Sequence, residues 1–311
     1  MVAVYNFETG KAMGLPDCME FDQSRCAPLA FRLMDLFYNL NLKDKVPEVV
    51  HSVPFIRKPN LHKMFILIGC AQDSRRQSET VYDGARRFLV EQEDNLWDLT
   101  MPGDTRIDKL GEEYFGGPIG RTSGDILRST LNFIHEKHGG SLDNLTQDGE
   151  PIDDVRKRLM GANGGIYGVG PGIASLIVKN LVRFNYYRPS DYYDLPIKID
   201  RHAMRLSLSH GVIRFTKPTP PGGIHTEALE QLLEDAYRDV CRKERYDPID
   251  FCDAKWAIGS QHCTGKYTQC ARTCDLRCDQ DYSIKDERYL VYPAKYAALP
   301  LFQAEIGNAN L

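Results

Sequence analysis

The segment 158–184, RLMGANGGIYGVGPGIASLIVKNLVRF, constrains the fold most, because its glycine-rich turn separates a short helical stretch from an amphipathic helix. Gly168 and Gly170 leave the backbone N–H groups of the turn unobstructed, at the positive end of the helix dipole. Such a helix start binds anions, although Gly-x-Gly before a helix also occurs in simple tight turns. The apolar residues of the helix recur at spacings of three and four and form two ridges, Ile173, Ile177 and Leu181, and Ala174, Val178 and Val182.

The same helical spacing extends over most of the chain and predicts an all-α fold in which strands are minor. The 311 residues, 42% of them hydrophobic, suffice for one large core or two smaller ones. Residues 280–311 show no apolar period, and we expect them to form an extended tail. The expected helices lie at 27–42, 62–72, 152–161, 170–185, 201–209 and 226–243, with one more ending at Gly139-Gly140 and one more preceding Cys263.

The sequence lacks signals for export or membrane insertion. No run of eighteen apolar residues occurs, and the first residues do not have the basic-then-apolar order of a secretory signal. We therefore expect no membrane span and a cytoplasmic location. The nine cysteines fit this expectation, because an odd number without an export signal does not suit a disulfide framework.

Four of the cysteines lie in one short window with the spacing C-x6-C-x3-C-x3-C: Cys263, Cys270, Cys274 and Cys278. Thiolates at this density are typical of a metal site. From the spacing alone, zinc and a [4Fe–4S] cluster fit equally well. The other five cysteines are scattered, and we expect them to be buried as small hydrophobic residues.

Basic residues gather in the segment 152–217, which contains eleven Lys and Arg and five Asp. The whole chain nevertheless has a formal net charge of -4, which argues against nucleic-acid binding by overall charge. The chain is therefore acidic, with one basic region around the glycine turn.

A single acidic residue stands out downstream of the glycine turn, in the segment IKIDRHAMRLSLSHGVI at 197–213. Asp200 directly precedes the helix expected at 201, and Asp is a common N-cap residue. A carboxylate at that helix start can at the same time face a bound sugar and stabilise positive charge on it. The structural and the catalytic interpretation of Asp200 are compatible.

Two of these segments resemble motifs of the helix-hairpin-helix (HhH-GPD) DNA glycosylase superfamily. In that family a Leu-Pro-Gly-Val-Gly turn grips a DNA phosphate; Gly168, Val169 and Gly170 match it, with Ile166 and Tyr167 in place of Leu and Pro. The segment 197–213 is similar to the family's Val-Asp-x-His-x-x-Arg sequence. Its matching residues are Asp200, His202 and Arg205.

Two further segments resemble the iron–sulfur members of this superfamily, the endonuclease III-like enzymes. LIGCAQDS at 67–74 is similar to their Ser-Ala-Gln segment and places Gln72 where a side chain fills the gap left by an extruded base. The family's cluster loop is C-x6-C-x2-C-x5-C, of which the first interval matches and the other two differ. The resemblance covers roughly residues 60–280 and favours a [4Fe–4S] cluster over zinc.

The resemblance implies two helical domains with a helix-hairpin-helix motif, a C-terminal [4Fe–4S] loop, and an active-site cleft between the domains. We expect an N-terminal arm and the first helices at 1–58, packing with the C-terminal domain, and a helical barrel domain with the wedge and the hairpin at 59–185. A helical domain with the catalytic aspartate is expected at 186–262, followed by the cluster loop at 263–280 and a tail at 281–311.

The resemblance also implies hydrolysis of the N-glycosidic bond of a flipped base in double-stranded DNA by a monomeric, nucleoid-associated enzyme. Asp200 is expected to stabilise the positive sugar and to orient the attacking water. The residues expected to contact DNA are Gln72, Gly168, Val169, Gly170, Gly172, Arg201 and His202.

Departures from the family pattern refine the expected activity. Gly172 occupies the position of the lysine that gives bifunctional members their strand-cleaving activity, so we expect a monofunctional enzyme; Lys198, near Asp200, is the remaining candidate for residual lyase activity. Leu67 replaces the catalytic glutamate of the adenine-mismatch members. A long insert, NYYRPSDYYDLP at 185–196, offers four tyrosines to a substrate pocket, or to a packed surface loop: Tyr186, Tyr187, Tyr192 and Tyr193.

Because of the insert and the N-terminal arm, we hypothesise that the enzyme acts on an unusual or bulky base, such as a modified pyrimidine of bacteriophage DNA. Its role would lie in repair or in phage defence. Two other interpretations stay open. One is a glycosylase-like enzyme of a phage-type base-modification system, to which the acidic remainder of the chain is suited. The other is a non-catalytic DNA-binding module in which Asp200 is only a cap.

Overall fold

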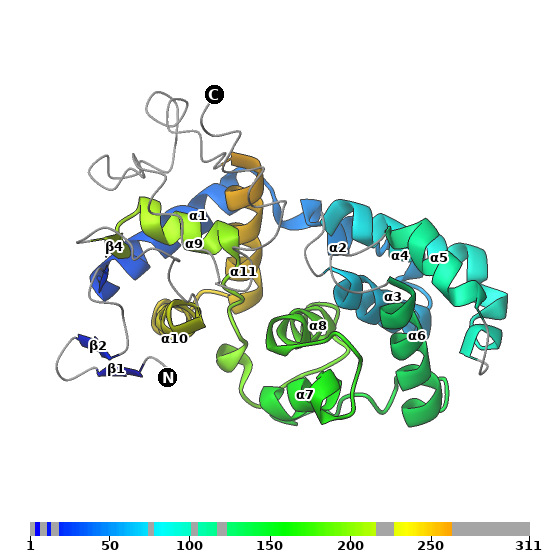
Figure 1. Cartoon of the computed structure of the whole chain (residues 1–311). Coiled ribbons are helices and arrows are strands. Elements are labelled where there is room, and N and C mark those ends of the chain that lie inside the picture. Colours follow the sequence, from blue (N-terminus) through cyan, green and yellow to red (C-terminus); the bar gives the residue numbers. More distant parts are fainter. Residues whose placement is uncertain are drawn as a thin grey trace. The chain divides into compact units, whose positions relative to one another are not determined.

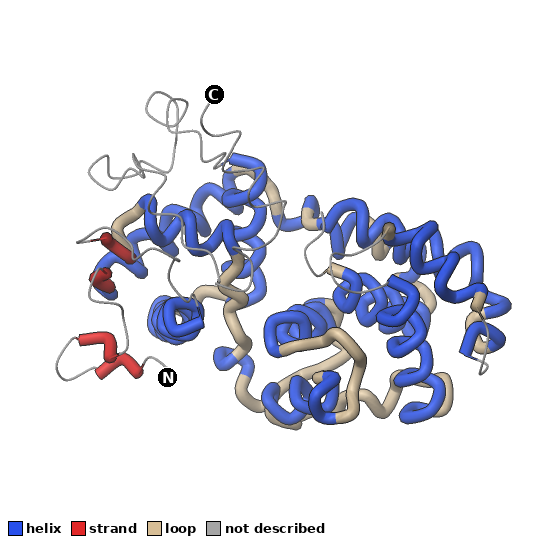
Figure 2. The backbone as a smooth tube through the Cα atoms, viewed as in Figure 1, coloured by secondary structure: helices blue, strands red, loops and turns tan. Residues whose placement is uncertain are grey.

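The structure is a computed structural model that describes residues 4–6, 11–13, 19–73, 78–100, 105–116, 123–215 and 227–262. Helices dominate this part of the chain, and its strands are short segments of three residues each (Figure 2). The predicted all-α class is therefore confirmed at this level. None of the described helices combines the length and the apolar character needed to cross a membrane.

The chain divides into two compact units, which we describe separately. The hairpin unit is Asp44–Pro196, and the aspartate unit combines Met1–Lys43 with Ile197–Leu311. The whole insert 185–196 thus belongs to the hairpin unit, whereas the sequence prediction places residues 186–196 in the domain of Asp200. Hydrogen bonds from Ile152 N to the Asp191 carboxylate (3.0 Å) and from Gly149 N to Arg188 O (2.8 Å) tie the insert to that unit.

The hairpin unit is built around α3 (Pro59–Gln72), in which every residue from His62 to Gln72 is buried. Helix α3 packs against α4, α6 and α8. The other helices of the unit are α2 (Pro47–Val50), α4 (Ser78–Gln92), α5 (Arg106–Phe115), α6 (Ser123–Asn132) with a π-helical turn at Phe133–Lys137, α7 (Ile152–Leu159) and α8 (Pro171–Arg183). Helices α7 and α8 pack side by side (Figure 1).

The aspartate unit packs α1 (Cys26–Asn39) against α10 (Glu227–Glu244) and α11 (Pro248–Ala257), and α9 (Arg201–Ser209) against α11 (Figure 1). A π-helical turn, Ile258–His262, continues α11. Two antiparallel pairs complete the unit: β1 (Val4–Asn6) with β2 (Lys11–Met13), and β3 (Met19–Phe21) with β4 (Ile213–Phe215). The pairing of β3 with β4 joins the N-terminal part of the chain to the segment that follows α9.

Candidate functional site

The turn between α7 and α8 is held by its own backbone. Gly161 N donates to Val169 O (3.0 Å), and Gly165 N donates to Met160 O (3.0 Å). A Cβ atom at Gly165 would lie 2.5 Å from Leu159 O, so only glycine allows this close approach. Gly161 and Gly165, which the sequence prediction does not single out, are therefore the glycines that make the turn compact.

The start of α8 is open to solvent and uncapped. Its N-cap is Gly170, with φ -98° and ψ -174°, and no side chain accepts a hydrogen bond there. The N–H groups of Gly170, Gly172 and Ile173 have no hydrogen-bond partner among the described residues. A Cβ atom at Gly170 or Gly172 would meet no atom within 4 Å. This helix start has the geometry of an anion site.

The other predicted members of the turn have structural roles. Gly168 has φ +87°, a left-handed conformation that favours glycine. Val169 is buried, and its N–H donates to Ile166 O (3.1 Å). The side chain and the N–H of Val169 are therefore both engaged inside the turn, and its contact with DNA stays a prediction.

Asp200 is the N-cap of α9, with φ -98° and ψ -178°. Its Oδ1 accepts hydrogen bonds from His202 N (2.9 Å) and Ala203 N (2.8 Å). Its Oδ2 accepts none from the described part of the chain, and the residue is half-buried. The expectation that Asp200 caps this helix is confirmed, and one carboxylate oxygen is left over.

The charge of Asp200 is set by its surroundings. Burial raises the pKa of the carboxyl group, but Lys198, the N–H of Ala203, His202 and Lys255 together lower it below the ordinary value. The carboxylate is therefore ionised at neutral pH. A fixed anion with an unbonded oxygen can stabilise positive charge or accept a proton.

The predicted DNA contacts on α9 lie next to Asp200. Arg201 is the first residue of α9. The ring of His202 faces the protein, with Nδ1 3.0 Å from Gly259 O, to which the Arg205 guanidinium also donates. A Cβ atom at Gly259 would lie 2.6 Å from that of His202, so the start of α9 rests directly on the π-helical turn after α11.

Gln72 does not have the position that a wedge requires. Its side chain is 1% exposed, and Nε2 donates to Ser123 O (2.9 Å). A wedge has to project from the surface to enter a base stack. The prediction for Gln72 is therefore corrected: the side chain fastens the end of α3 to the start of α6.

The four tyrosines of the insert all lie in the hairpin unit, in different environments. Tyr187 is buried, and its hydroxyl donates to Glu150 O. It is a core residue, which corrects its assignment to a substrate pocket. The Tyr186 hydroxyl lies 2.9 Å from Nδ1 of buried His62. Tyr192 and Tyr193 are half-buried, with their rings edge to face at 5.5 Å.

The cysteine window lies outside the described residues: Cys263, Cys270, Cys274 and Cys278. Within the described ranges, no group of three or more His, Cys, Asp or Glu is arranged to hold a metal ion. Cys263 directly follows the π-helical turn Ile258–His262, which Gly259 fixes against α9. Four thiols in one short window of the sequence are a suitable donor set for iron–sulfur or zinc.

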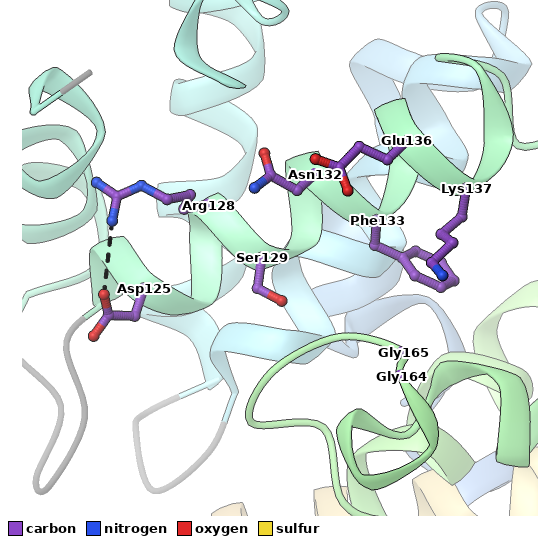
Figure 3. Close-up of a pocket in the computed structure, with 9 residues that line it drawn as sticks. All are labelled: Asp125, Arg128, Ser129, Asn132, Phe133, Glu136, Lys137, Gly164 and Gly165. Carbon is purple, nitrogen blue, oxygen red and sulfur yellow. Dashed lines mark ion pairs between the residues drawn. The ribbon is translucent and has the colours of Figure 1, made fainter. Parts of the chain in front are cut away.

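A cavity of about 280 Å³ lies between α6 and the hairpin loop (Figure 3). It contains none of the predicted site residues, and several of its polar groups are engaged in structural contacts, whereas Asn132 Oδ1 is buried without a hydrogen-bond partner among the described residues. Ser129 Oγ accepts a hydrogen bond from Tyr167 N (2.7 Å), and Arg128 pairs with Asp108 (2.9 Å) and Asp125 (3.9 Å). The lining residues are Asp125, Arg128, Ser129, Asn132, Phe133, Glu136, Lys137, Gly164 and Gly165.

The sequence prediction does not include two residues near the candidate groups, Tyr167 and Lys255. Tyr167 is 50% exposed and directly precedes Gly168 in the hairpin turn. Lys255 is buried in α11 and contributes to the charge around Asp200. An aromatic residue in place of the family's proline was the available signal for Tyr167, whereas nothing local distinguishes Lys255. Comparisons of the chain with protein-family models, curated proteins and solved structures found no match, so its resemblance to the glycosylases rests on the motifs.

Proposed function

We propose that the chain is a monofunctional DNA N-glycosylase that hydrolyses the N-glycosidic bond of a damaged or modified base flipped out of double-stranded DNA. The observation that carries the proposal is Asp200, an ionised, half-buried carboxylate at a helix start with Oδ2 unbonded by the described residues. The open start of α8 supports a DNA partner, because its N–H groups suit a backbone phosphate. The proposal requires both helix starts to engage the same DNA.

The reaction follows from the charge of Asp200. As the bond between C1′ and the base breaks, the base leaves with the electron pair and the sugar becomes positively charged, which the carboxylate stabilises. The oxygen of a water molecule then bonds to C1′, and Asp200 Oδ2 accepts the proton that this water loses. The departing base takes up a proton from solvent.

The lysines of the chain support hydrolysis rather than a covalent intermediate. The position of the lyase lysine is Gly172, and Lys179 on the same helix is buried with Nζ 3.3 Å from Glu48 Oε1. Lys198 remains, since it lies two residues before Asp200 and forms no ion pair with a described residue. We expect borohydride to trap no adduct between protein and DNA, and efficient trapping that disappears in Lys198→Met would replace hydrolysis by a lysine mechanism.

The remaining parts of the proposal concern the surroundings of the reaction. The four thiols of the cysteine window would hold a [4Fe–4S] cluster, which in such a loop is structural. The half-buried Tyr192 and Tyr193 are the tyrosines that we propose to contact a bulky base, such as a modified phage pyrimidine. We further propose a monomer associated with the nucleoid.

The decisive experiment compares Asp200→Asn with Asp247→Asn. Asp247 is the N-cap of α11 and accepts hydrogen bonds from Ile249 N (2.8 Å) and Asp250 N (3.3 Å), so it matches Asp200 as a cap in the same unit. Asparagine is also a good N-cap, and both variants should fold. Released bases are measured by mass spectrometry from DNA that carries varied lesions and natural modifications.

We expect Asp200→Asn to slow base release roughly a thousandfold, about 4 kcal/mol in the barrier, with DNA binding unchanged. Asp247→Asn should release base at the wild-type rate. The cap contacts of Asp200 also favour a second candidate, a DNA-binding module without catalysis. That candidate is correct if the wild-type protein binds DNA but releases no base, or if the two variants behave alike.

A further inference from the structure

Lys255 is a buried cation that the proposed reaction does not use. It lies on α11, is 3% exposed, and its Nζ donates to the backbone carbonyl of Lys198 at 3.0 Å. The amino group also lies over the rings of Tyr237 (5.6 Å) and Phe251 (5.4 Å). It forms no salt bridge with a carboxylate of the described chain.

Packing does not explain a lysine at this position. The buried residues of α11 near Lys255 include the apolar Phe251, Ala254 and Ala257 as well as Asp250 and Asp253. An apolar side chain at this position would fill the site without desolvating a charge. Burial lowers the pKa of Lys255, while Cys252, Asp200, Cys241 and Glu234 oppose this shift. One carbonyl and two aromatic faces only partly replace the water that the ammonium group loses.

The hydrogen bond of Lys255 connects it to the segment that carries Asp200. Lys198 lies two residues before the carboxylate, and Ile197 at the start of this segment is fully buried. A hydrogen bond to the Lys198 carbonyl fixes the extended backbone that delivers Asp200 to the start of α9. The positive charge of Lys255 acts on the Asp200 carboxylate as well, together with Lys198 and His202.

We propose that Lys255 is a positioning residue for Asp200: its hydrogen bond to the Lys198 carbonyl fixes the segment that carries the carboxylate, and its amino group adds positive charge beside it. The inference rests on the proposed function, since it assigns the role of Lys255 through Asp200. Lys255 itself has no access to a substrate, because its amino group is enclosed by α10, α11 and the Lys198 backbone.

Three variants separate the two contributions. Lys255→Met removes the donor and the charge, Lys255→Gln keeps a donor without the charge, and Lys255→Arg keeps the charge. Lys43→Met is the matched control, because it breaks a lysine contact in the same unit, Lys43 Nζ to Asp250 Oδ2 at 2.9 Å, that does not involve Asp200. Single-turnover base release is followed over pH, together with DNA affinity and thermal unfolding.

We expect Lys255→Met to lower the single-turnover rate by about a hundredfold, as a misplaced catalytic group does, with DNA affinity within about twofold of the wild type. The acid limb of its pH–rate profile should move to higher pH, because the carboxylate loses a nearby positive charge. Lys255→Gln should show the shifted limb with a smaller loss of rate, and Lys255→Arg should keep the limb of the wild type. Lys43→Met should match the wild type in the single-turnover rate and in the position of the acid limb.

The inference is overturned if the acid limb stays in place in both neutral variants, whatever the rate, since a purely structural lysine would leave it unmoved. It can also be judged without catalysis, from the pKa of the Asp200 carboxyl group measured by ¹³C NMR. A higher pKa in Lys255→Gln than in the wild type supports the inference even if the protein releases no base. An unchanged pKa overturns it.

Discussion

The starts of α8 and α9 have nearly the same backbone and opposite chemistry. Gly170 and Asp200 are N-caps with φ -98° in both and ψ -174° and -178°. Asp200 supplies a carboxylate to the N–H groups of its own helix, whereas at Gly170 the N–H groups of Gly172 and Ile173 are left without a described partner. One side chain at one position therefore decides whether a helix start presents an anion or receives one.

The start of α8 lacks the capping side chain that α9 and α11 have, from Asp200 and Asp247. Because glycine is itself a tolerated N-cap, its absence costs roughly a few tenths of a kcal/mol. Backbone strain does not explain its absence at Gly170, whose φ suits any residue and whose Cβ would meet no atom. An open helix start is what the proposed contact with a DNA phosphate requires.

The largest effect is expected from copying the aspartate onto α8. Gly170→Asp should cap the N–H groups of Gly172 and Ile173 and repel a phosphate there. Because hydrogen bonds to a charged group contribute roughly 2 kcal/mol each, DNA affinity should fall about a thousandfold, or about 4 kcal/mol. Fluorescence anisotropy with duplex DNA at fixed salt measures this loss of affinity.

Gly170→Ala is the control for this experiment, since it adds a Cβ atom into open space without a charge. Its affinity should stay within a few-fold of the wild type. Equal DNA affinities of Gly170→Asp and the wild type would show that the start of α8 does not bind the backbone, and the contrast with α9 would then be one of helix capping alone.

Both helix starts were predictable because their signals are local. The glycine pattern and the aspartate stand in the sequence next to the helices they begin, and the helix expected at 201–209 is α9 (Arg201–Ser209). Helices α4 and α5 are absent from the prediction although apolar residues recur at helical spacing in α4, at Val81, Tyr82, Ala85, Phe88 and Leu89. Their contact could not be predicted: a Cβ atom at Gly84 would lie 2.2 Å from Tyr114 O, so the two backbones approach closely there.

The errors at the site have the same origin, since they involve partners far away in sequence. Gln72 looks like a polar helix end until Ser123, 51 residues later, accepts its amide. Tyr187 looks available to a ligand until its hydroxyl reaches Glu150 O in the core of the hairpin unit. No window of sequence around either residue contains its partner.

The second prediction separates the two units by their response to acid. His62 in α3 is buried, and burial lowers its pKa to about 4, whereas an unfolded histidine has a pKa of about 6.5. Its contribution to stability is therefore present above about pH 6.5 and is lost as pH falls towards 4, by up to about 3 kcal/mol. Burial lowers the pKa of His138 as well, which acts in the same direction.

Asp200 behaves differently, because its folded pKa is depressed. Its contribution is present above the unfolded pKa of about 3.9 and is lost only below that. Hydrogen exchange at about pH 5 should thus show lower protection in α3 and α8 than at pH 7, with α9 and α11 little changed. His62→Phe should reduce the difference between the units; the same pH dependence in this variant would contradict the assignment to His62.

The third prediction concerns Tyr167, the exposed ring next to the open helix start. Tyr167→Ala should weaken duplex binding about tenfold, since an aromatic contact with a nucleotide contributes roughly 1–3 kcal/mol. Tyr167→Phe keeps the ring and should bind like the wild type. The backbone of the turn is held by Tyr167 N and Ser129 Oγ, which neither variant alters. Equal affinities of the two variants would place the DNA elsewhere on the hairpin unit.

The smallest effect is expected when the start of α9 is made a copy of the start of α8. Asp200→Gly should lower the free energy of unfolding by only a few tenths of a kcal/mol, because glycine is itself a tolerated N-cap. It leaves the N–H groups of His202 and Ala203 unpaired near Lys198 and Lys255. Inorganic phosphate should therefore raise the melting temperature of this variant more than that of the wild type, through binding to the folded state.

Asp247→Gly tells whether this response is a general property of an uncapped helix. It removes the same two cap contacts at the start of α11, where Lys43, paired with Asp250, is the neighbouring cation. A larger stabilisation by phosphate in Asp200→Gly than in Asp247→Gly means that the surroundings of α9 favour an anion, and that Asp200 supplies one permanently. Equal responses would mean that the helix dipole alone accounts for the anion, and the special charge environment assigned to Asp200 would be contradicted.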